Sequence, residues 1–215
     1  IKMNTGNPRS KIWLLKAIVW TTLSSEGCAL MAIEVISTKL LSSYYGNTIY
    51  IWSGMLFSTL SGLAVGYFIG GKGAKSSSIF KLVLITLTTA LFILLLPDIT
   101  KSIIPRTLAL SLKEGSLLSC FILIAPPMVL IGSIGPIAVD LLANYSNAPT
   151  GKIAGKAFFT STISGAMSTF IFALFMIPNL GLQFSTQALA FTLSLTGIAY
   201  LFHQLFKVKH EIFRA

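Results

Sequence analysis

Long apolar runs alternate with short polar or basic segments along this chain, and the alternation predicts a bundle of membrane-spanning helices. A helix needs about 20 apolar residues to cross a hydrocarbon core of about 30 Å, and each run has about that length or more. The predicted helices cover residues 12–41, 48–71, 78–96, 116–143, 151–177 and 183–206. The pattern therefore predicts an all-α integral membrane protein that folds as a six-transmembrane-helix bundle.

Prolines and polar residues set the predicted boundaries of these helices. Pro97 is expected to end the third helix, because proline has no backbone N–H to donate. Residues 98–115 mix charges with isoleucine and leucine, which is typical of an amphipathic connection at the membrane interface. A turn at residues 178–181 is expected between the fifth and sixth helices. The fourth helix is expected to kink or break where these residues gather: Pro126, Pro127, Gly132, Gly135 and Pro136.

Composition supports the membrane prediction and adds an orientation. Hydrophobic residues make up 54% of the chain and charged residues 10%, whereas soluble proteins carry about 25% charged residues. The net charge is +10, and most basic residues lie at helix ends on the side of the N-terminus. The positive-inside rule then places the segment 1–11 and the basic tail 207–215 in the cytoplasm. No nucleic acid is expected as a partner, because basic residues placed in this way meet anionic lipid.

Two carboxylates in the first predicted helix are the main candidates for chemistry. Glu26 and Glu34 are eight residues apart, so they share one broad face of a helix with 3.6 residues per turn. Ionisable groups in hydrocarbon are costly and usually face a bundle interior or a water-filled path. Each glutamate therefore belongs either to a cation or proton site or to a structural hydrogen bond with a neighbouring helix.

Asp140 and Lys156 are the other charged candidates within the predicted helices. They lie on either side of the predicted turn between the fourth and fifth helices. The two side chains either pair across this hairpin or extend separately to water at the membrane interface.

Small residues recur at every fourth position in two of the predicted helices. This pattern allows helices to approach closely, so we expect tight packing against another helix or a second copy of the chain. The second helix carries Gly54, Ser58, Gly62, Gly66 and Gly70, and the fifth carries Ala157, Ser161, Gly165, Thr169 and Ala173.

The sequence offers no catalytic constellation, and no cofactor or metal is expected. It contains no dinucleotide-binding glycine pattern after a strand, no phosphate-binding loop and no zinc-binding helix motif. The two histidines, His203 and His210, have no obvious ligating partners on a second helix. The chain is therefore not predicted to be an enzyme by itself.

Two stretches of sequence resemble the membrane domain of bacterial spermidine synthase-like proteins, including those described as fused major-facilitator/spermidine synthase proteins. The first is EGCALMAIEVISTKLLSSYYGNTIYIWSG, followed by GYFIGGKGAK, and the second is GKIAGKAFFTSTISGAMSTFIFALFMIPNLG. The resemblance implies a multi-pass module of the bacterial inner membrane. The chain departs from the family in carrying no soluble aminopropyltransferase domain, so none of the family's catalytic residues is assigned.

Three functional hypotheses follow from the residues and the resemblance together. The first is a non-catalytic anchor or accessory subunit of a larger membrane complex, in contact with lipid and with other membrane subunits or a second copy. The second is a transporter-like half module for a small cationic solute, such as a polyamine, or for proton coupling at Glu26 and Glu34. The third is the membrane part of an aminopropyltransferase whose soluble domain lies outside this chain.

Overall fold

The computed structural model describes the backbone of residues 8–74, 79–146 and 148–212, and the side chains of residues 13–74, 79–146 and 148–202. All the regular structure within these ranges is helical. The elements are α1 (Pro8–Tyr45), α2 (Ile49–Ala74), α3 (Ile79–Thr107), α4 (Leu112–Asn144), α5 (Thr150–Ile171), the π-helical η1 (Phe172–Met176) and α6 (Ile177–Ile212). The first residues of the predicted segment 1–11 and the last residues of the predicted tail 207–215 lie outside this description.

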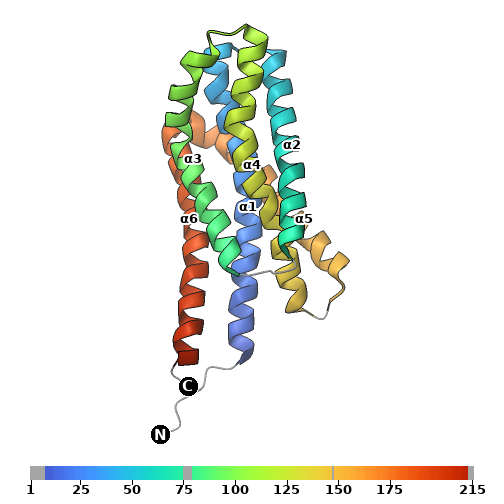
Figure 1. The fold of residues 1–215 in the computed structure, drawn as a ribbon. Coiled ribbons are helices and arrows are strands. Elements are labelled where there is room, and N and C mark those ends of the chain that lie inside the picture. Colours follow the sequence, from blue (N-terminus) through green and yellow to red (C-terminus); the bar gives the residue numbers. More distant parts are fainter. Residues whose placement is uncertain (1–7, 75–78, 147, 213–215) are drawn as a thin grey trace.

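The helices form an elongated bundle with α1 near its centre (Figure 1). α2 packs on α4, α3 packs on α6, and α1 contacts α4, α5 and α6. Five helical stretches among the described residues are long and apolar enough to cross a membrane, and the last of them runs continuously from Thr150 to Phe202. The protein is therefore an all-α membrane protein. α1 has 38 residues, about 57 Å at 1.5 Å per residue, and extends beyond α2 and α3 at one end of the bundle (Figure 1).

The predicted boundary of the third helix at Pro97 is wrong. α3 continues through Pro97 and Pro105 to Thr107, and α4 begins at Leu112. The predicted connection 98–115 is therefore the end of one helix, a short turn and the start of the next. Burial explains the difference: Leu96 and Ile104 are almost fully buried on either side of the polar stretch, so packing maintains the helix despite the lost hydrogen bonds.

The sequence predicted a kink or a break in the fourth helix. α4 remains one helix through its three prolines, so it is not broken there. Its first turn is capped by Ser111, whose Oγ accepts a hydrogen bond from the Glu114 N–H at 3.3 Å and donates one to Glu114 Oε2 at 2.9 Å. Most of the apolar residues of α4 are buried. Neighbouring helices on several sides therefore hold α4 helical where proline removes a backbone donor.

α5, η1 and α6 follow one another without an intervening loop, but the backbone leaves helical geometry at Gly181. The φ and ψ angles there are 80° and 169°, a conformation that glycine adopts without the strain that a Cβ atom causes. Gly181 ends the PNLG segment that was predicted as a turn. α5 crosses behind the bundle, and beyond the kink α6 runs back toward the end where α1 begins (Figure 1).

The small residues of α2 lie against the backbone of α4. A Cβ atom added to Gly66 would lie 2.5 Å from the Val129 carbonyl oxygen, and one added to Gly70 would lie 2.6 Å from that of Ser133. The remaining members of this ladder, Gly54, Ser58 and Gly62, are buried as well. Glycine therefore allows α2 and α4 to touch backbone to backbone.

The ladder of α5 packs on α1, so the two ladders do not meet each other. Ala157 is buried, and a Cβ atom added to Gly165 would lie 2.9 Å from the Met31 side chain and 3.0 Å from the Gly27 carbonyl oxygen. Thr169 and Ala173, further along the same ladder, are only partly buried. The close approach of α1 and α5 is thus centred on Gly27 and Gly165.

Candidate functional site

Glu26 lies in the middle of α1, at the point where α5 comes closest. Its side chain is 3% exposed, and its Oε2 atom accepts a hydrogen bond of 2.7 Å from the Ser161 hydroxyl of α5. The neighbouring Gly27 makes this contact possible, because a Cβ atom at that position would overlap the Ser161 carbonyl group. The small residues of the α1–α5 contact therefore bring a hydroxyl to a buried carboxyl group.

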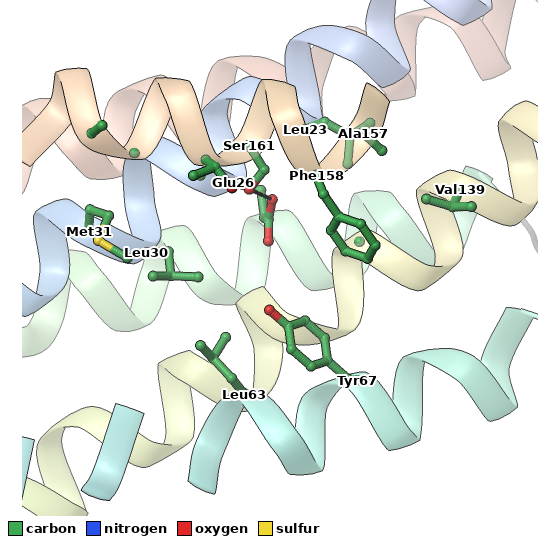
Figure 2. A pocket seen from close by; sticks show the side chains of 15 residues that line it. Leu23, Glu26, Leu30, Met31, Leu63, Tyr67, Val139, Ala157, Phe158 and Ser161 are labelled. Carbon is green, nitrogen blue, oxygen red and sulfur yellow. Dashed lines mark hydrogen bonds between the residues drawn. The ribbon is translucent and has the colours of Figure 1, made fainter. Parts of the chain in front are cut away.

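Glu26 faces a cavity of about 320 Å³ between α1, α2, α4 and α5 (Figure 2). The walls are mostly apolar. Polar side chains on the cavity wall are those of Glu26, Tyr67, Ser161 and Thr162. The Tyr67 hydroxyl points across the cavity toward the Glu26 carboxyl group (Figure 2). Oxygen atoms from three helices therefore converge in an otherwise hydrocarbon-lined space.

No cationic side chain neutralises Glu26 within the described parts of the chain. The ion pair found there joins Lys101 Nζ to Asp98 Oδ1 at 3.3 Å, on an exposed part of α3. The second carboxyl oxygen of Glu26 has no hydrogen-bond partner among the described side chains. A carboxylate buried without a counter-charge is costly in a low-dielectric interior. A bound cation or a proton would remove that cost.

Exposed side chains on α2 and α5 indicate that the cavity opens sideways between these two helices. Tyr67 and Phe158, which line its outer edge, are 43% and 58% exposed. α2 and α5 make no direct contact with each other in the part of the chain that the structure describes. A ligand that enters from the bilayer would therefore pass between α2 and α5.

The structure does not bring the other charged candidates to this cavity. Glu34 is half-buried two turns further along α1 and does not line the space around Glu26. Asp140 Oδ2 accepts a hydrogen bond from Asn144 Nδ2 at 3.3 Å. Lys156 is exposed and forms no ion pair with Asp140. Of the four charged residues singled out from the sequence, Glu26 alone faces the cavity.

A second cavity, of about 610 Å³, lies on the other side of the α1–α5 contact and is lined by α1, α5 and α6. Hydroxyl groups join the two helices beside it. The Ser24 and Ser164 hydroxyl oxygens are 2.7 Å apart, and the Ser168 hydroxyl donates to the Cys28 carbonyl oxygen at 2.9 Å. None of the described residues that line this cavity is charged. Its polar groups are used in helix packing, which is their usual role between membrane helices.

Two partners of Glu26 were not recognised from the sequence. The sequence places Ser161 in the small-residue ladder of the fifth predicted helix and Tyr67 in the stretch GYFIGGKGAK, and neither position indicates a contact with Glu26. Neither residue is close to Glu26 in the chain, and no spacing rule links an isolated serine or tyrosine to a distant carboxylate. The signal lies in the fold, which brings α1, α2 and α5 around one space.

Three helices, α1, α2 and α5, thus contribute polar side chains to one site. Comparison of the chain with protein-family models, with curated proteins and with solved structures finds no match. The resemblance to spermidine synthase-like membrane domains therefore stays a prediction from sequence motifs.

Proposed function

We propose that this protein is a transporter-like membrane module that binds a monovalent cation, either a proton or a small cationic solute, at Glu26. The observation that carries the proposal is that the Glu26 carboxyl group is buried beside a cavity and has no ion-pair partner among the described side chains. Ionisable groups placed in this way inside membrane proteins commonly lie on ion or proton pathways. The hydrogen bond from Ser161 fixes one carboxyl oxygen and leaves the other directed at the ligand space.

Few other titratable groups are available to share a proton with Glu26. Tyr67 faces it from α2, while the parts of α4 and α5 that line the cavity contribute no titratable side chain. Cys28, the nearest thiol on α1, lines the second cavity instead. A proton or cation that enters this space therefore has Glu26 as its main binding group.

We further propose six membrane crossings in a bacterial inner membrane, with both termini in the cytoplasm. The kink at Gly181 supports this topology, because α5 and α6 run in different directions on either side of it (Figure 1). α5 packs mainly on α1, whereas α6 packs on α3 and α1. The distribution of basic residues then favours a cytoplasmic location for the end at which α1 begins.

The test compares two isosteric variants of the purified protein in lipid vesicles. Infrared difference spectroscopy during a pH titration should detect a carboxyl band from Glu26 that is absent in Glu26→Gln. Glu34→Gln is the matched control on the same helix, and it should keep the band. A titration identical in the wild type and in Glu26→Gln would contradict the proposal, because the carboxyl group would then take no part in proton binding.

A second candidate function, an accessory subunit of a membrane complex, is favoured by the apolar surface that α5 and α6 leave uncovered. Large apolar side chains are exposed on both helices, among them Phe158, Phe159 and Phe170 on α5 and Phe191 and Leu195 on α6. These helices therefore expose apolar surface to lipid, to another subunit or to a second copy. Extraction from native membranes in mild detergent should give a complex heavier than the 23.2 kDa chain. A lone chain under these conditions would speak against this role.

A further inference from the structure

We infer that the Glu26 cavity is shaped for a small organic ammonium ion that carries one positive charge on an aliphatic body. The inference rests on the proposed cation site and specifies the class of its ligand. Three features of the cavity lead to it: a single acidic group, a small set of oxygen acceptors and apolar walls that open to the bilayer.

The single acidic group sets the charge of the ligand. Among the described residues that line the cavity, Glu26 is the only acidic one, and Glu34 lies elsewhere on α1. One ammonium group balances one carboxylate. A diamine or polyamine would leave a second ammonium group in an apolar space without a counter-charge, which costs several kcal/mol unless that group reaches water. The cavity therefore favours a monoamine over a polyamine.

The oxygen acceptors on the cavity wall favour an ammonium group over a divalent metal ion as the charged part of the ligand. An ammonium group has three N–H donors, and the cavity wall carries enough oxygen acceptors to pair them: the free Glu26 oxygen and the hydroxyl groups of Ser161, Thr162 and Tyr67. A calcium or magnesium ion takes six or more oxygen ligands, including several carboxylates or waters. No group of three or more acidic, histidine or cysteine side chains suited to a metal occurs among the described residues.

The remaining walls suit an aliphatic body. Leucines and valine from three helices surround the space between Glu26 and the opening: Leu23, Leu30, Leu63 and Val139. The Tyr67 and Phe158 rings lie next to each other on the cavity wall (Figure 2), and both are exposed, so their faces can attract a passing cation. At about 320 Å³, the cavity lies at the lower end of the range for small-molecule sites, about 300–1,000 Å³.

The test measures binding to the full-length protein in lipid nanodiscs by isothermal titration calorimetry. The probes are n-butylamine as its ammonium ion, the diamine with the same carbon chain, and sodium chloride as the inorganic cation. We expect butylammonium to bind and the diamine to bind at least about tenfold more weakly, because of its second buried charge. Glu26→Gln should abolish butylammonium binding, and Glu34→Gln should leave it unchanged.

A second variant tests the apolar space without touching the carboxyl group. Val139→Phe extends a larger side chain from the cavity wall, so it should weaken butylammonium binding while the infrared band of Glu26 persists. Equal or tighter binding of the diamine would overturn the inference, and so would the absence of amine binding alongside an intact Glu26 titration. In both cases the proposed cation site would stand. If Glu26→Gln still bound butylammonium, both the inferred ligand class and the proposed cation site at Glu26 would be overturned.

Discussion

At the scale of single residues, the Glu26–Ser161 hydrogen bond joins the chemistry of the site to the packing of α1 on α5. The bond is 2.7 Å long and lies beside the closest backbone approach between these helices. Loss of the hydroxyl therefore affects stability and the position of the carboxyl group at once. A side chain that only filled space would affect stability alone.

Ser161→Ala should lower the free energy of unfolding by about 1 kcal/mol, because the buried carboxyl group loses its partner. Unfolding by denaturing detergent in mixed micelles measures this change. Ser53→Ala, at an exposed position of α2, is the matched control and should have little effect. The same substitution should also shift the infrared band of Glu26. An unchanged band would show that Ser161 acts in packing only.

Residue types in the sequence indicated part of this site. A glutamate in an apolar run can be recognised as a candidate site residue from the sequence alone, because a carboxyl group surrounded by hydrocarbon is unusual in any fold. Glu34 also lies in an apolar run and yet does not line the cavity. Whether a residue of α1 lines the cavity depends on which helix packs against its side of α1. Ser161 and Tyr67 gave no signal of their own. Their roles arise from contacts between helices that are far apart in the chain.

At the scale of helices, the α2–α4 contact depends on the absence of side chains. Gly66→Ala places a methyl group against the Val129 carbonyl oxygen, which α4 can accommodate only by moving. Alanine favours a helix over glycine by about 1 kcal/mol, whereas overpacking costs about 1–3 kcal/mol. We expect a net loss of up to about 2 kcal/mol in the free energy of unfolding.

Gly71→Ala is the control for this prediction, because a Cβ atom at Gly71 meets nothing within 4 Å. It should leave the protein as stable as before or slightly more stable. Unfolding in mixed micelles distinguishes the two variants. If both alanine variants proved equally stable, the close contact between α2 and α4 would not contribute to stability.

The ends of helices were predicted less well than their existence. Apolar length is a property of the sequence, so the six predicted stretches all fall on helices of the structure. The count of six separate helices is not supported, because the fifth and sixth stretches form one continuous candidate span from Thr150 to Phe202. Whether Pro97 ends α3 depends on the burial of Leu96 and Ile104, which the sequence does not specify. The same reasoning applies to Pro136 in α4. A proline is a reliable boundary only where no neighbouring helix supports the turn that follows it.

At the scale of the whole molecule, the kink at Gly181 decides how many times the chain crosses the membrane. Six crossings place both termini on one side, and five would place them on opposite sides. We therefore expect peptide tags at the two termini to be digested together, in inside-out vesicles and not in right-side-out ones. Digestion of the two tags in opposite preparations would exclude the six-crossing topology. A tag inserted after Leu110 should show the reverse accessibility and serves as the control.

The sideways opening of the Glu26 cavity has a consequence for the apparent affinity of any ligand that enters through it. The concentration that matters is the one dissolved in the lipid, and this depends on the partition coefficient between membrane and water. Each added methylene group favours transfer out of water by about 0.8 kcal/mol, or about fourfold. Titrations against the aqueous concentration would therefore give longer alkylamines a lower apparent dissociation constant. This holds even where the longer chain gains no contact with Tyr67, Phe158 or the walls behind them. Selectivity would begin in the bilayer itself, before the protein is reached.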